Sequence, residues 1–112
     1  MIYIASGLAV LVAAFQVYLG LNLESFGVGG LHTHITIAVI LLMLFHVPFL
    51  RGEGLTKKFY LGLVGLLGLQ GLIGLYMAFV QHVETLRIIH HMFGWLILLG
   101  TLGGAVLLFL KK

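Results

Sequence analysis

The chain has 112 residues, of which 62% are hydrophobic and only 8% are charged, and its formal net charge is +3. A soluble domain of this length needs a charged face on each helix, so the composition excludes an ordinary soluble fold and indicates an integral membrane protein. The sequence contains no cysteine, which excludes disulfides, thiolate metal sites, iron–sulfur clusters and haem attached through cysteine.

Four charge-free stretches predict four transmembrane helices. In chain order, the predicted spans cover about residues 2–23, 31–50, 59–81 and 87–110. Each contains an apolar run of about 20 residues, which is enough for a helix to cross a hydrocarbon core of about 30 Å. Because the connections are short, we expect one all-α domain, an integral membrane four-helix bundle with up-down-up-down topology.

The loop charges predict the orientation of these spans. Five of the six basic residues lie either within residues 51–58, after the second span, or in the tail Lys111–Lys112. The positive-inside rule therefore predicts that this side and both termini are cytoplasmic, in a cell inner or plasma membrane. The opposite, outer side carries two glutamates and Arg87.

The two halves of the chain look like a repeat, which predicts two pseudo-repeated helix pairs. The pattern Gln16-x-x-x-Gly20 in the first span recurs 54 residues later in the third span as Gln70-x-x-x-Gly74. Histidines open both the second and the fourth span, at offsets of 56 to 58: His32, His34, His90 and His91. Since both halves point the same way, their axis would lie along the membrane normal.

The histidines are the strongest functional signal. Five of the six fall at the outer ends of spans two, three and four: His32, His34, His82, His90 and His91. Polar groups at membrane depth are costly and usually face the bundle interior with a partner. Neutral imidazole ligates haem iron, and facing histidines on two helices can supply both axial ligands. We therefore expect one haem b near the outer face, between spans two and four. We interpret His82 as an interfacial residue.

The sequence leaves the ligand pair open. The repeat pairs His34 with His90, which is the first choice. His32 with His90 is the second, because His32 lies fourteen residues before His46 and about 40° from it around the helix. His91 is the alternate on the fourth span.

Glycines suggest where a flat ring would fit. Gly20, Gly74 and Gly94 lie near the predicted ligands, and a glycine recurs at every third position from Gly62 to Gly74. Such positions let a helix or a macrocycle approach the backbone closely. We expect Arg87 and the outer loops to meet the haem propionates.

His46 lies toward the cytoplasmic side and has two interpretations. The residue fourteen positions after His90 is Gly104, so the fourth span offers no second histidine there. Either His46 is hydrogen-bonded as a structural residue, or it serves a second haem that is five-coordinate or completed by another chain.

At this point the sequence resembles the membrane b-type cytochromes. It is also similar to one half of haem A synthase, through the segments Leu69-Gln70-Gly71-Leu72-Ile73-Gly74 and His90-His91-Met92-Phe93-Gly94. That family has a glutamate three residues before the histidine of the second span. Here the residue three positions before His34 is Leu31, and the residue three positions before His32 is Gly29. The loop cysteines of that family are also absent.

These observations favour a haem b-binding electron-transfer cytochrome, or a haem-bearing subunit of a respiratory or quinol-linked complex, over an enzyme. The expected partners are the lipid bilayer, a redox protein or a quinone, and further copies or subunits in a membrane complex. The basic residues do not cluster as nucleic-acid binding would require, so we expect no nucleic-acid partner. The alternatives are a half-size, haem A synthase-like haem-modifying enzyme, a histidine-ligated copper or zinc protein, and an accessory subunit without a cofactor.

Overall fold

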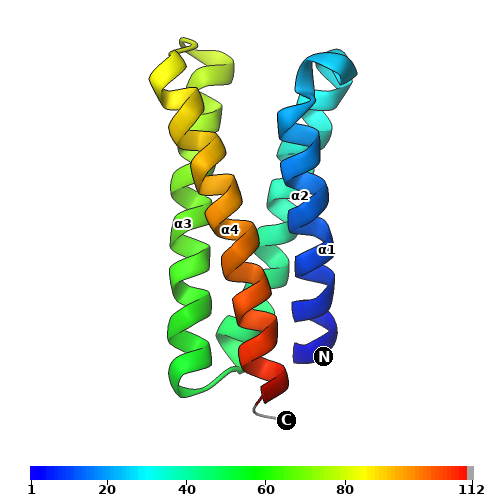
Figure 1. Ribbon diagram of the computed structural model, residues 1–112, viewed down its shortest axis with the longest axis vertical. Coiled ribbons are helices and arrows are strands. Elements are labelled where there is room, and N and C mark those ends of the chain that lie inside the picture. Colours follow the sequence, from blue (N-terminus) through cyan, green and yellow to red (C-terminus); the bar gives the residue numbers. More distant parts are fainter. Residues whose placement is uncertain (111–112) are drawn as a thin grey trace.

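The computed structural model describes residues 1–110, and for residues 24–26 and 28 it describes the backbone only. The chain forms four helices: α1 (Ile2–Leu21), α2 (Leu23–Arg51), α3 (Gly54–Phe79) and α4 (Glu84–Leu110) (Figure 1). The four predicted helices are therefore confirmed, and residues 1–110 contain no strand. The predicted basic tail Lys111–Lys112 lies outside the described residues.

All four helices are long and apolar enough to cross a membrane. The segments that meet this criterion are Ile2–Leu21, Gly29–Arg51, Gly54–Phe79 and Glu84–Leu110. Helix α2 begins earlier than expected, at Leu23, but its backbone leaves helical geometry at Gly27, where φ is 67°. Glycine adopts this conformation without the steric cost that other residues incur. The connection between the first two predicted spans therefore includes a kink inside α2.

The helices form a closed ring in which each packs against its chain neighbours and α1 packs against α4. Helices α2 and α4 consequently occupy opposite corners, as do α1 and α3. We call the end with the α1–α2 and α3–α4 connections the upper end, and the end with the α2–α3 connection the lower end. In Figure 1 the α1–α2 pair and the α3–α4 pair diverge toward the upper end and close together below it.

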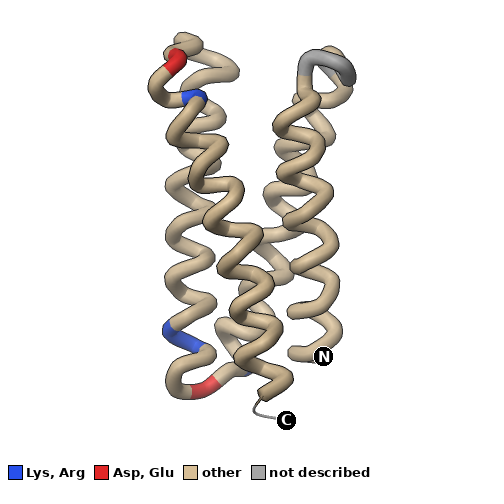
Figure 2. Tube along the Cα trace, viewed as in Figure 1, with Lys and Arg blue, Asp and Glu red and all other residues tan. Residues whose placement is uncertain are grey.

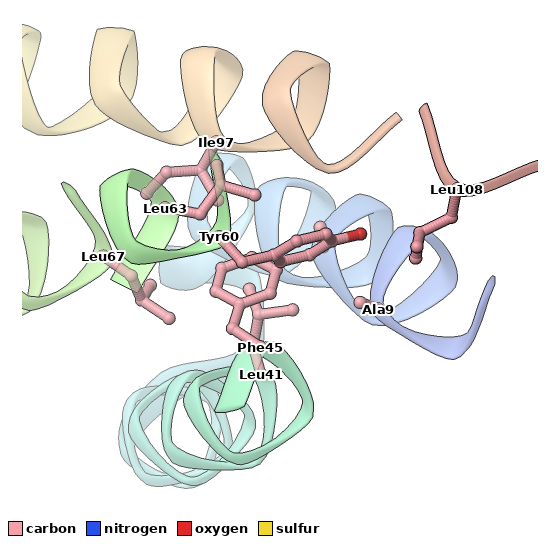
Figure 3. Packing of buried hydrophobic residues seen from close by; sticks show 9 residues of the cluster. Ala9, Leu41, Phe45, Tyr60, Leu63, Leu67, Ile97 and Leu108 are labelled. Carbon is pink, nitrogen blue, oxygen red and sulfur yellow. The ribbon is translucent and has the colours of Figure 1, made fainter. Parts of the chain in front are cut away.

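Side chains fill the lower half of the bundle. Tyr60 of α3 is fully buried, and its hydroxyl lies 3.0 Å from the Ser6 hydroxyl of α1, in a hydrogen bond across the bundle. The Phe45 ring of α2 lies 6.1 Å from the Tyr60 ring. Figure 3 shows these two rings together, with Leu41 beneath them. A Cβ atom on Gly104 of α4 would lie 2.6 Å from the Tyr60 hydroxyl oxygen, so Gly104 provides the space for the tyrosine.

The surface of the bundle is apolar between its ends. Large hydrophobic side chains are exposed on all four helices, with Leu11, Met43, Leu72 and Leu99 each more than 60% exposed. The described Lys, Arg, Asp and Glu residues lie only at the two ends, as Figure 2 shows. This distribution is typical of helices whose sides contact lipid.

Substituting Gly104 tests the lower core. Gly104→Val should destabilise the bundle by about 1–3 kcal/mol, because the added side chain displaces Tyr60. The matched control is Gly62→Ala, where a Cβ atom meets nothing within 4 Å. That change should be neutral or stabilising by up to about 1 kcal/mol, since alanine favours the helix. Unfolding in detergent micelles, followed by circular dichroism, measures both. Equal stabilities would contradict the tight packing at Tyr60.

Candidate functional site

Two imidazoles meet across the upper part of the bundle. His34 comes from α2 and His90 from α4, the two helices at opposite corners. Their ring centroids lie 6.2 Å apart, and the ring planes are inclined by 75°. Both residues are partly buried. The structure thus brings together the pair that the repeat favours.

A glutamine on the preceding helix holds each histidine. The Gln16 side-chain amide of α1 donates from Nε2 to the His34 backbone oxygen, at 2.8 Å. The Gln70 amide of α3 donates from Nε2 to the His90 backbone oxygen, at 3.0 Å. The two hydrogen bonds are equivalent in the two halves. The predicted repeat is therefore visible as a repeated contact.

A glycine makes room for each imidazole. A Cβ atom on Gly20 would lie 3.1 Å from His34 Cε1, and one on Gly74 would lie 2.9 Å from His90 Cε1. Because real Cβ atoms almost never come closer than about 3 Å to another heavy atom, an alanine at Gly74 would push the ring aside. Each half of the bundle thus contains the same set of three residues, a glutamine, a glycine and a histidine.

The two sets differ at the second ring nitrogen. His90 Nδ1 lies 3.1 Å from the Gln70 backbone oxygen. A carbonyl only accepts, so this nitrogen carries the hydrogen and the Nε2 lone pair is left available to a metal. His34 Nδ1 is buried and has no such partner within the described part of the chain.

A hollow surrounds the two rings. With its open mouth included, it holds about 400 Å³ of empty space, and its lining includes Gly20, His34, Gln70, His90, His91 and Trp95. Cofactor pockets are usually concave and mostly apolar. The hollow combines apolar walls with a few converging polar groups, as such pockets do.

The other predicted site residues on α4 surround this pair. The His91 ring lies 6.0 Å from the His90 ring and lines the hollow. A Cβ atom on Gly94 would lie 3.0 Å from Gln70 Nε2, so Gly94 makes room for the glutamine amide rather than directly for a ring. Arg87 is exposed at the upper end, where its Nε donates to Glu84 Oε2 at 2.9 Å.

The remaining histidines do not join the pair. His32 and His82 are exposed. Thr36 and Met43, which lie on the same face of α2 as His32, are also exposed. His46 hydrogen-bonds through Nδ1 to the Leu42 backbone oxygen at 2.7 Å, within its own helix.

Most of the glycines that recur along α3 from Gly62 to Gly74 do not contact the histidine pair. Only Gly74 contacts an imidazole, whereas Cβ atoms at Gly62, Gly65, Gly68 and Gly71 would meet nothing within 4 Å. Among these glycines, only Gly74 therefore makes room for an imidazole. Sequence reasoning also assigned no role to Gln16 and Gln70. The available signal was their recurrence four residues before the two glycines that contact the rings.

The donor set suits a metal that brings most of its own ligands. Among the side chains that the structure describes, no group of three or more His, Asp or Glu is gathered as a bare copper or zinc ion would require. Two facing imidazoles are what a macrocyclic metal complex needs, since the macrocycle supplies the other four donors.

Comparisons with protein-family models, with curated proteins and with solved structures found no match to this chain. The functional argument therefore depends on the geometry and chemistry of the site.

Substituting Gly74 tests the close approach of His90 to α3. Gly74→Ala should displace the His90 ring and shift its side-chain NMR signals, because the new methyl group would lie only 2.9 Å from Cε1. Gly71→Ala is the matched control one helical turn earlier, in open space. It should leave the His90 signals in place. Identical spectra for the two variants would show that the ring does not lie against Gly74.

Proposed function

We propose that this chain is a membrane electron-transfer cytochrome that binds one haem b through His34 and His90. The observation that carries the proposal is the 6.2 Å between their ring centroids. Metal–imidazole bonds measure about 2 Å, and an imidazole nitrogen lies about 1.1 Å from its ring centre, so two imidazoles sharing one metal have centroids about 6 Å apart. The observed separation fits two axial ligands on one iron.

The surroundings of the rings support the same proposal. Metal-binding histidines usually donate their second ring N–H to a carbonyl or a carboxylate, as His90 does to Gln70. Gly20 and Gly74 keep the backbones of α1 and α3 close to the rings. The hollow around the rings is lined by both histidines and by Gly20.

The residues of the chain would bind, orient and shield the cofactor. When bound, haem supplies a one-electron iron couple. His34 and His90 would occupy both axial positions, which suits electron relay better than oxygen chemistry. Gln16 and Gln70 orient the two ligand helices through their backbone oxygens. Arg87, exposed at the upper end, would be available to the propionates.

The closed lower half favours a single haem. Tyr60 and Phe45 fill the bundle there. The Tyr60 ring packs directly against Gly104, so no hollow separates Gly104 from the core. His46 is satisfied by the Leu42 carbonyl. We therefore assign His46 the structural role.

We further propose that all four helices span a bilayer, with the lower end in the cytoplasm of a plasma or inner membrane. The apolar surface and the charges confined to the ends support insertion. Lys57 and Lys58 lie near the start of α3 at the lower end, and the positive-inside rule supports the orientation. A quinone or a redox protein would exchange electrons near the upper end, where the hollow lies.

Replacing the ligands tests haem binding. Purified wild-type protein should show a sharp low-spin b-type spectrum and one haem per chain in a pyridine haemochrome assay. His34→Ala and His90→Ala should each abolish the low-spin spectrum, because one axial bond is lost. His82→Ala, at an exposed histidine, is the control and should bind haem like the wild type. A wild-type protein without a Soret band would overturn the proposal.

Single cysteines test insertion and orientation, since the chain has none of its own. In intact cells a membrane-impermeant maleimide should label Thr85→Cys at the upper end. Lys58→Cys at the lower end should react only after the cells are opened. The reverse pattern would overturn the orientation, and labelling of both sites in intact cells would contradict a spanning bundle.

A further inference from the structure

Two buried polar atoms beside His34 lack a hydrogen-bond partner. The two atoms without a partner among the described side chains are Gln16 Oε1 and His34 Nδ1. An unsatisfied buried polar atom costs about 1–3 kcal/mol, so native structures rarely leave one unpaired. Here both residues line the same hollow, and the Gln16 amide already donates to the His34 backbone oxygen.

The hydrogen-bonding roles of the two atoms are complementary. The His34 backbone oxygen can only accept, so the Gln16 atom that contacts it must be the NH₂ nitrogen, and Oε1 is the remaining acceptor. When Nε2 of a neutral histidine binds a metal, Nδ1 carries the hydrogen and is a donor. One unpaired donor and one unpaired acceptor thus lie in one hollow without contacting each other directly.

A water molecule can connect these two atoms. The hollow leaves about 30 Å³ of space that water molecules can occupy. A bound water needs at least about 10–15 Å³ and two or more polar partners, and both conditions hold here. Such a water would accept from His34 Nδ1 and donate to Gln16 Oε1.

We propose that Gln16 is a positioning residue for His34 through both ends of its amide. Its Nε2 holds the His34 backbone oxygen, and its Oε1 receives the Nδ1 hydrogen of His34 through one bound water. This inference rests on the proposed haem site, where it assigns the partner that His34 Nδ1 lacks.

The proposal makes the two glutamines unequal despite the repeat. In the α3–α4 half, the acceptor for His90 Nδ1 is the backbone oxygen of Gln70, which any side chain at this position retains. In the α1–α2 half, the acceptor is reached only through the Gln16 side chain. Equivalent substitutions should therefore affect the two axial ligands differently.

The experiment compares haem-loaded Gln16→Met with haem-loaded Gln70→Met. Each change removes one amide-to-backbone hydrogen bond and keeps a similar side-chain volume. Only the Gln16 change also removes the partner of an imidazole nitrogen, and loss of such a partner typically weakens metal binding by about 10–100-fold. Haem transfer to apomyoglobin should be at least about tenfold faster for Gln16→Met than for Gln70→Met. The reduced Gln16→Met protein should also bind carbon monoxide more readily, as a loosened His34 would allow.

Equal rates for the two variants, or wild-type behaviour of Gln16→Met, would overturn the inference while leaving the haem site intact. A wild-type protein without haem would overturn both. If Gln16→Met does not fold, a high-resolution map of the wild-type haem protein decides. A water between His34 Nδ1 and Gln16 Oε1 supports the inference, and its absence refutes it.

Discussion

Polar groups inside an apolar bundle must find their partners inside that bundle, and this constraint organises the whole structure. Water cannot reach them from the sides if those sides face lipid, so each buried polar side chain needs a local acceptor or donor. Ser6 and Tyr60 satisfy each other in the lower half. In the upper half, the Gln16 and Gln70 side chains donate to the backbone oxygens of His34 and His90, respectively.

The two halves of the bundle divide the tasks of stability and chemistry. The lower half is filled by aromatic and aliphatic side chains and holds the four helices together. The upper half encloses a hollow in which the polar groups converge. A packed end and an open end in one small domain allow a cofactor site to form without weakening the core that supports it.

Much of the fold follows from the sequence, because the positions of the few charges limit where apolar helices can begin and end. The His34–His90 pairing follows as well, since the repeat of Gln16-Gly20 as Gln70-Gly74 sets equivalent positions on the following helices.

The argument for His32 started from His46, and it assumed that a histidine inside the membrane marks the inward face. His46 instead bonds to a carbonyl of its own helix, so it carries no information about that face. The three-residue spacing of the glycines in α3 does not by itself show which of them contacts a ring. A residue every third position drifts around a helix, and Gly62 lies roughly 120° away from Gly74. The roles of the glutamines depend on a contact between helices, which no single-sequence pattern displays.

The backbones of α2 and α4, which carry the two imidazoles, do not approach each other closely, so the spacing of the imidazoles is set through α1 and α3 and through the packed lower half. The lower core acts as a pivot, and the upper part of each helix pair acts as a lever arm. His90 lies fourteen residues from Gly104, or about 21 Å along α4, so a tilt of about 5° at the pivot moves the imidazole by about 2 Å. Metal–ligand distances tolerate only about 0.2 Å. If the proposed haem is bound, repacking around Tyr60 would change the coordination geometry at the opposite end of the bundle. The spectrum of the iron would then report on the packing of a core that it never contacts.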